Sequence, residues 1–109
     1  MTAYFSVRAE IADPADKQEF DRWYQHEHLP LALQTFKPKR AWRAWSEVNP
    51  NVHYVFFEFD SVSAPRALAG SDGMKKMAQH FDAAWGERVS RTREVLDVVQ
   101  ELEATKDYL

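Results

Sequence analysis

Residues 20–30 read FDRWYQHEHLP, and no other segment of the chain concentrates as many aromatic and titratable side chains. In a helix of about 3.6 residues per turn, most of the large side chains of this segment form one stripe along one face, and Asp21 lies outside it. The stripe consists of Phe20, Trp23, Tyr24, Glu27, His28 and Leu31. Pro30 lacks an N–H group and disfavours the helical region at Leu29. We therefore expect a helix over residues 14–28, a break near Leu29 and a second short helix to about Phe36.

The chain on either side of this segment alternates between strand and helix patterns. Period-two alternation predicts strands over residues 3–11, 39–48, 52–60 and 91–102. Asp13-Pro14 is typical of a helix start, and further helices are expected over residues 61–70 and from 71 to about Gly86. The order β-α-β-β-α-β indicates an α+β, ferredoxin-like fold with a four-stranded antiparallel sheet and helices on one face, formed by residues 1–109 as a single domain.

Aromatic side chains are expected on both faces of this sheet. Alternation places Trp42 and Trp45 on opposite faces, and likewise Tyr54 and Phe57. Helices on one side would leave the other aromatic face exposed, which is unfavourable for a monomer. We therefore expect a two-fold homodimer in which sheet packs on sheet.

Composition excludes several classes of protein. The 109 residues carry 14 basic and 17 acidic side chains without a basic stripe, so a nucleic-acid partner is not expected. The absence of cysteine excludes disulfides and thiolate chemistry. No signal-peptide pattern and no apolar run of about 20 residues is present, which favours a cytoplasmic protein without membrane contact. The polar tail over residues 103–109 is expected to fray, with Tyr108 and Leu109 as side chains that could dock on a neighbour.

The two histidines of the central segment do not form a metal motif. His26 and His28 lie two residues apart and point about 200° apart on a helix. The i, i+4 spacing of zinc-protease helices is absent because position 30 is proline. We expect neither a metal site nor a cofactor, with one histidine solvated and one packed.

His28 and Tyr24 are the leading pair for acid–base chemistry. They are i, i+4 neighbours on the sheet-facing stripe, where an imidazole beside a phenol can serve as general acid or base. The alternative is that both are core residues whose polar atoms are satisfied near Pro30. Arg8, Arg43 and Arg93 are weaker candidates for binding a carboxylate. His80 is expected to be solvated.

The motif Trp23-Tyr24-x-x-Glu27-His28-Leu29-Pro30 resembles the W-Y-x-x-E-H-L-P segment of EthD-like dimeric α+β barrel proteins. Residues 81–86 and 91–93 are similar to the second helix and last strand of the same group. The resemblance implies a ferredoxin-like protomer, two sheets paired into a barrel, and a pocket between helices and sheet in each subunit. The wider superfamily includes cofactor-free monooxygenases, isomerases, polyketide cyclases and haem-binding relatives.

Three functional hypotheses follow. The first is a cofactor-independent enzyme of monooxygenase, isomerase or cyclase type that acts on a hydrophobic aromatic or lactone-like molecule. His28 and Tyr24 would be catalytic, and the substrate would contact Trp23, Glu27, Phe20 and Arg43. The second is a non-catalytic ligand-binding or stress-associated dimer. The third is a haem-binding relative that uses His28, His53 or His80.

Overall fold

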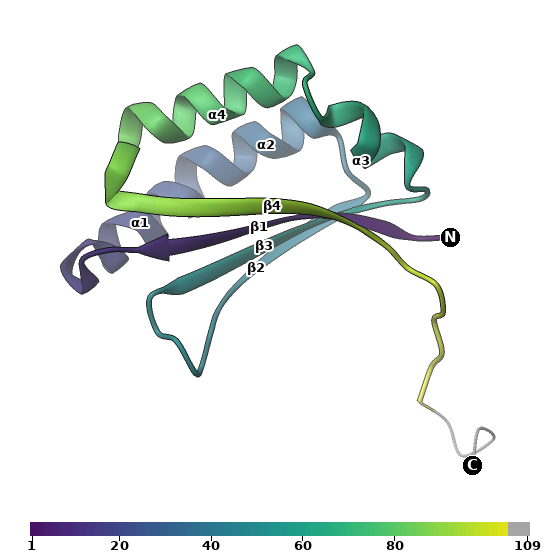
Figure 1. The fold of residues 1–109 in the computed structure, drawn as a ribbon, viewed down its shortest axis with the longest axis horizontal. Coiled ribbons are helices and arrows are strands. Elements are labelled where there is room, and N and C mark those ends of the chain that lie inside the picture. The colour runs from purple at the N-terminus through teal and green to yellow at the C-terminus, as the bar shows by residue number, and fades with distance from the viewer. Residues whose placement is uncertain (105–109) are drawn as a thin grey trace.

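The computed structural model describes residues 1–104, which form one antiparallel sheet covered by helices on a single face (Figure 1). The strands lie in the order β2-β3-β1-β4. This arrangement confirms the predicted α+β, ferredoxin-like fold. The elements are β1 (Ala3–Ile11), α1 (Lys17–Trp23), α2 (Leu29–Phe36), β2 (Arg40–Trp45), β3 (Val52–Phe59), α3 (Ser63–Leu68), α4 (Asp72–Ala84) and β4 (Val89–Asp97).

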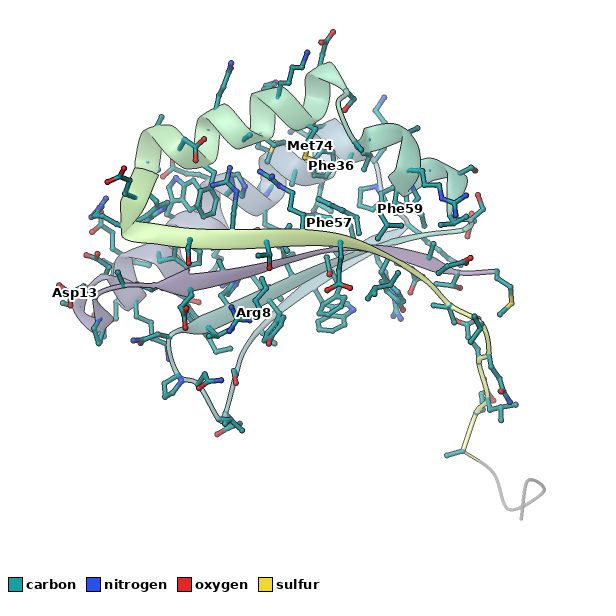
Figure 2. All side chains as sticks on the ribbon, viewed as in Figure 1. Arg8, Asp13, Phe36, Phe57, Phe59 and Met74 are labelled. Atoms are coloured by element: carbon teal, nitrogen blue, oxygen red, sulfur yellow. The ribbon has the colours of Figure 1, made fainter. Side chains whose placement is uncertain are left out.

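Strand β1 organises the core because it pairs with β3 on one side and with β4 on the other. Every second side chain from Ala3 to Ile11 is buried, as the period-two pattern predicts, and on the other face only Ser6 is buried as well. Phe5 lies opposite Phe57 of β3, and their rings stack with centroids 6.0 Å apart. Figure 2 shows Phe36, Phe57, Phe59 and Met74 between the helices and the sheet, whereas Arg8 projects from the helix-free face. The main hydrophobic cluster therefore lies on the helical side.

The predicted break near Leu29 is wrong. The chain stays helical through Leu29, at φ −66° and ψ −45°, because one π-helical turn over Tyr24–His28 joins α1 directly to α2. The N–H group of Leu29 donates to the carbonyl of Tyr24 instead of to that of Gln25. Pro30 then lies in the first turn of α2, where its missing N–H group costs little. The helix start is as expected: a 3-10 helix over Pro14–Asp16 leads into α1, and the Asp13 side chain accepts a hydrogen bond from the Ala15 N–H group.

The last strand begins and ends earlier than the predicted range of 91–102. Its length is set by β1, because Val89 pairs with Ile11 and Asp97 pairs with Ala3 at the two ends of that strand. Beyond Asp97, no strand within residues 1–104 lies alongside to continue the ladder. The polar tail was predicted over residues 103–109. Its positions 105–109, which include Tyr108 and Leu109, lie outside the described residues. Within residues 1–104, no helix combines the length and apolar character needed to cross a membrane.

Helices α2 and α4 approach each other closely at Gly73. A Cβ atom built on Gly73 would lie 2.9 Å from the Cγ2 atom of Thr35. The Thr35 hydroxyl is held by a 2.8 Å hydrogen bond to the carbonyl of Leu31. A β-branched side chain fixed in this way has little freedom to move aside. The contact therefore requires glycine at position 73.

The substitution Gly73→Ala tests this contact. We expect it to lower the free energy of unfolding by about 1–2 kcal/mol, because overpacking outweighs the helix propensity gained from alanine. In a Thr35→Ser background, which removes Cγ2 and keeps the hydroxyl, the same change should become neutral or stabilising. Urea unfolding of the four proteins measures both effects. An equal loss in the two backgrounds would show that Thr35 does not cause it.

Candidate functional site

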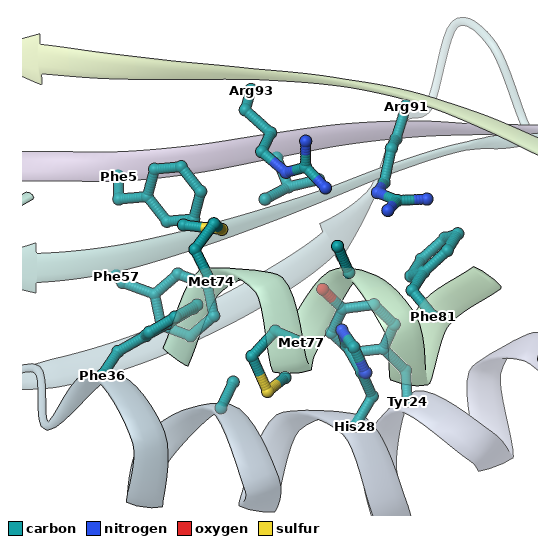
Figure 3. A pocket seen from close by; sticks show the side chains of 13 residues that line it. Phe5, Tyr24, His28, Phe36, Phe57, Met74, Met77, Phe81, Arg91 and Arg93 are labelled. Atoms are coloured by element: carbon teal, nitrogen blue, oxygen red, sulfur yellow. The ribbon is translucent and has the colours of Figure 1, made fainter. Parts of the chain in front are cut away.

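The candidate site is a cavity between the sheet and helices α2 and α4 (Figure 3). Tyr24 and His28 both line it, with apolar side chains from β1, β3 and helices α2 and α4 around them and two arginines from β4. Its volume of about 30 Å³ is room for roughly two water molecules. The lining residues are Phe5, Val7, Tyr24, His28, Ala32, Phe36, Phe57, Met74, Met77, Ala78, Phe81, Arg91 and Arg93.

The π-helical turn determines how the side chains of the central segment meet. In a regular α-helix, residues five apart point about 140° away from each other. Here Trp23 and His28 stack, with ring centroids 4.5 Å apart and planes at 21°. Tyr24 meets His28 edge-on at 5.0 Å, so the expected Tyr24–His28 neighbourhood is present. Trp23 thus packs against the imidazole of His28 and does not itself line the cavity.

His28 is hydrogen-bonded to a second histidine from α4. The Nδ1 atoms of His28 and His80 lie 2.9 Å apart, and the two rings stack at 5.2 Å. His80 also stacks on Trp23 at 5.4 Å. His80, which was expected to be solvated, is half-exposed: it keeps contact with solvent, and the helical turn that buries Met77 and Phe81 also directs it towards α1. One of the two rings donates and the other accepts, so their tautomers are linked.

Burial keeps the site's acid–base groups neutral. It lowers the pKa of His28 to about 3, with a smaller contribution from His80 and then from Arg91. Burial likewise lowers the pKa of His53 to about 3, assisted by the nearby Arg43 cation. It raises the pKa of the Tyr24 phenol. At neutral pH the cavity therefore presents an uncharged imidazole and an uncharged phenol.

A separate polar network fixes α1 to the sheet. Arg43 donates from Nη1 to Asp21 Oδ1 at 2.8 Å, and the Trp45 indole donates to the same oxygen at 2.8 Å. The hydrogen bond from Arg43 lowers the pKa of Asp21. Arg43 also lies 3.3 Å from Nε2 of His53. Asp21, which the helical stripe left unassigned, is therefore an anchor of the fold, and Arg43 is engaged outside the cavity lining.

The remaining residues predicted to contact a substrate lie around the cavity and not in it. Phe20 has no exposed surface and packs edge-on against His53 at 5.2 Å. Glu27 and His26 are exposed and border a surface hollow together with Trp23. Substrate contact by Phe20, Trp23, Glu27 or Arg43 stays a prediction. In the described part of the chain, no group of three or more histidine, aspartate or glutamate side chains converges as a metal site.

Sequence reasoning underrated the contribution of β4 to the cavity. Arg91 and Arg93 have the same parity as Val89, so both occupy core-facing positions of the strand. The predicted strand began at residue 91 and so left out Val89. Because Val89 is buried, it shows that the alternate residues Arg91 and Arg93 face the core. The two arginines are the charged groups of the cavity lining.

Comparison with solved structures identifies the fold. An EthD family protein from Bacillus halodurans matches with a TM-score of 0.64 at 17% identity, covering 86% of this chain and 97% of that one. A mutant of SnoaB, a cofactor-independent oxygenase from Streptomyces nogalater, matches with a TM-score of 0.63 at 14% identity, covering 94% and 98%. A putative antibiotic biosynthesis monooxygenase from Bordetella bronchiseptica matches with a TM-score of 0.68 at 12% identity, covering 92% and 100%.

These similarities confirm the expected resemblance to EthD-like proteins at the level of the fold. No protein-family model matches the chain, and no curated protein matches it significantly. Because one fold hosts many activities, the function has to be argued from the cavity.

The lowered pKa values of His28 and His53 predict acid sensitivity. Between pH 6.5 and about 3 the unfolded chain binds protons at these residues and the folded chain does not, so stability falls as the pH drops through this range. We expect a loss on the order of 2 kcal/mol per histidine between pH 7 and pH 5. Urea unfolding of His28→Gln should show a smaller loss than the wild type. His26→Gln, which changes an exposed histidine, is the control, and an unchanged loss in His28→Gln would contradict the prediction.

Proposed function

We propose that this protein is a small enzyme that removes a proton from a hydrophobic aromatic or lactone-like molecule without a resident cofactor, with His28 as the base. The observation that carries the proposal is the neutral, buried imidazole of His28 at the wall of a cavity. A neutral imidazole has a ring nitrogen free to accept a proton, and the anion that forms in the substrate would offset the burial that lowers the pKa of His28. Proton removal of this kind is a step that isomerases, cyclases and cofactor-free oxygenases can share.

The His28–His80 hydrogen bond supports this role. When Nδ1 of His28 donates to His80, its Nε2 atom keeps a free lone pair, and within residues 1–104 that atom makes no hydrogen bond. The base would take the proton at Nε2. Its Nδ1 proton could then pass to His80, which is half-exposed and so in contact with solvent. Trp23 holds both rings parallel and acts here as a positioning residue.

The cavity must widen before it can hold such a substrate. Met74 and Met77 line it, and the flexible thioether chains of methionine rearrange at low cost. Met74 also borders an open groove of about 420 Å³ that runs past Phe5 towards Gly70 and Val95. Displacement of Met74 would join the groove to the cavity and give the substrate a path to His28.

The haem hypothesis receives less support from the geometry. His28 and His53 are almost fully buried, and Nδ1 of His28 is engaged by His80. A porphyrin is also far larger than a cavity of about 30 Å³. Non-catalytic ligand binding remains the main competing hypothesis, because the cavity serves either role.

A homodimer is the second part of the proposal. The helix-free face carries an aromatic patch, consisting of Tyr4, Trp42, Tyr54 and Phe56, that no part of residues 1–104 covers. Trp42 stacks on Phe56 at 4.3 Å and is nevertheless 44% exposed. Burial of large aromatic rings is a strong source of association energy. We infer that a second copy packs its own sheet on this patch.

Turnover tests the enzymatic proposal. We expect a panel of small phenols and unsaturated lactones to contain compounds that the wild type converts, followed by oxygen consumption and mass spectrometry. The variant His28→Gln should lose roughly 100-fold or more of that rate, because a general base contributes at least this factor. His26→Gln should keep it. Compounds that raise the melting temperature and are recovered unchanged would instead support a binding protein, and full activity of His28→Gln would exclude His28 as the base.

The oligomeric state tests the dimer. Light scattering coupled to size-exclusion chromatography should give the mass of two chains for the wild type. Trp42→Glu should give the mass of one chain, because it places a charge within the aromatic patch of the proposed interface. Val48→Glu is the matched control, since Val48 is an 85% exposed apolar residue between β2 and β3. A monomeric wild type, or a dimeric Trp42→Glu variant, would contradict the arrangement.

A further inference from the structure

The edge strand β4 directs two guanidinium groups towards the cavity. Arg91 pairs with Ala9 and Arg93 with Val7, and both of these β1 residues are buried in the core. The arginines therefore occupy positions where the neighbouring strands place apolar side chains. Figure 3 shows Arg91 and Arg93 reaching from β4 over the cavity towards Tyr24 and Met74.

The two arginines differ in what they contact. Arg91 donates to Asp82 at 2.9 Å, and its guanidinium lies 4.1 Å from the ring centroid of Phe81. Arg93 makes no hydrogen bond or ion pair with any residue in the described part of the chain. It borders both the cavity and the open groove, so it lies at the junction between them. Partial burial lowers the pKa of Arg93, which is the electrostatic cost of a cation without an anionic partner.

The Tyr24 hydroxyl supplies a second unused donor. Tyr24 is 2% exposed, and its hydroxyl makes no hydrogen bond within residues 1–104. In Figure 3 this hydroxyl points into the cavity, on the side of the two arginines. The hydroxyl lies at the surface of the cavity, where it can donate a hydrogen bond to an acceptor that enters the cavity. Because burial raises its pKa, the Tyr24 phenol stays protonated, and its O–H group can donate a hydrogen bond to such an acceptor.

We propose that the ligand of this cavity is an amphipathic monocarboxylate, whose carboxylate lies between Arg93 and Tyr24 and whose apolar body lies against Phe5 and Met74. This deepens the proposed function and rests on it for the location of the site. One cation and one neutral donor match the single charge and two oxygens of a carboxylate, whereas a phosphate dianion would keep an unbalanced charge. Glu94 also borders the groove, but its pairing with Ser6 turns its side chain to the helix-free face.

Binding of benzoate and of benzamide, its neutral counterpart of the same shape, tests the charge preference. Chemical-shift titrations of the full-length protein should show benzoate binding roughly ten-fold more tightly, with shifts at Tyr24 and Met74. Arg93→Gln should remove the preference and leave the affinity for benzamide unchanged, and Arg93→Lys should restore part of it. Arg22→Gln, which removes an exposed arginine of α1, is the control for net charge and should keep it.

Equal affinities in the wild type, a preference that survives in Arg93→Gln, or no benzoate-induced shifts at the cavity would each overturn this inference. The test separates the carboxylate site from the enzymatic proposal. Turnover of neutral compounds that depends on His28, without an anion preference, would reject the carboxylate ligand and keep the enzyme. An anion preference that depends on Arg93, in a protein that converts none of the compounds, would keep the carboxylate ligand and reject the enzyme.

Discussion

The π-helical turn over Tyr24–His28 is the constraint on which the site depends. By adding one residue to a helical turn, it brings Trp23 and His28 into a stacked pair and keeps the chain helical up to Pro30. A regular helix would separate these rings, and a break would release His28 from the helix altogether. Such turns are often found at functional positions in helices. Here the turn gives a buried imidazole a fixed ring orientation between Tyr24, Trp23 and His80.

The depth at which a side chain is buried determines whether it is charged in this cavity. Groups far from solvent, such as His28 and Tyr24, are held in their neutral forms because burial penalises charge. Charge appears only at the edge strand, where Arg91 is paired with Asp82 and Arg93 is not. The site therefore combines a neutral base, His28, in the cavity with a cation, Arg93, that is unpaired in the described part of the chain and lies where the cavity meets the groove. This division suits a ligand with an apolar body and one anionic end.

The fold explains where a site can form and leaves the chemistry open. Helices on one face of the sheet create the interior cavity, and the other face carries the aromatic patch around Trp42 and Phe56. Proteins that share this fold at 12–17% identity include an oxygenase and an EthD family protein. Because one fold hosts many activities, the function of this chain has to be argued from His28, His80 and Arg93.

Periodicity in the sequence by itself determined the architecture. Period-two alternation located β1 from Ala3 to Ile11, helical spacing brought Tyr24 and His28 to one face, and Asp13-Pro14 marked the helix start. These features depend on neighbours within a few residues, and local spacing encodes them. The resemblance of the W-Y-x-x-E-H-L-P segment pointed to the same fold.

The contacts between elements are visible only in the folded chain. His28 and His80 are 52 residues apart, and Asp21 and Arg43 are 22 apart. Whether such pairs meet depends on how packing rotates each element about its axis, which a one-dimensional pattern does not specify. The π-helical turn is a further example. Pro30 indicates that the helix is irregular at this point, but it does not show whether the helix breaks or widens. In the folded chain the helix widens, and Trp23 and His28 pack against α4. The ends of β4 were likewise set by its partner, because a strand ends where β1 no longer offers hydrogen bonds.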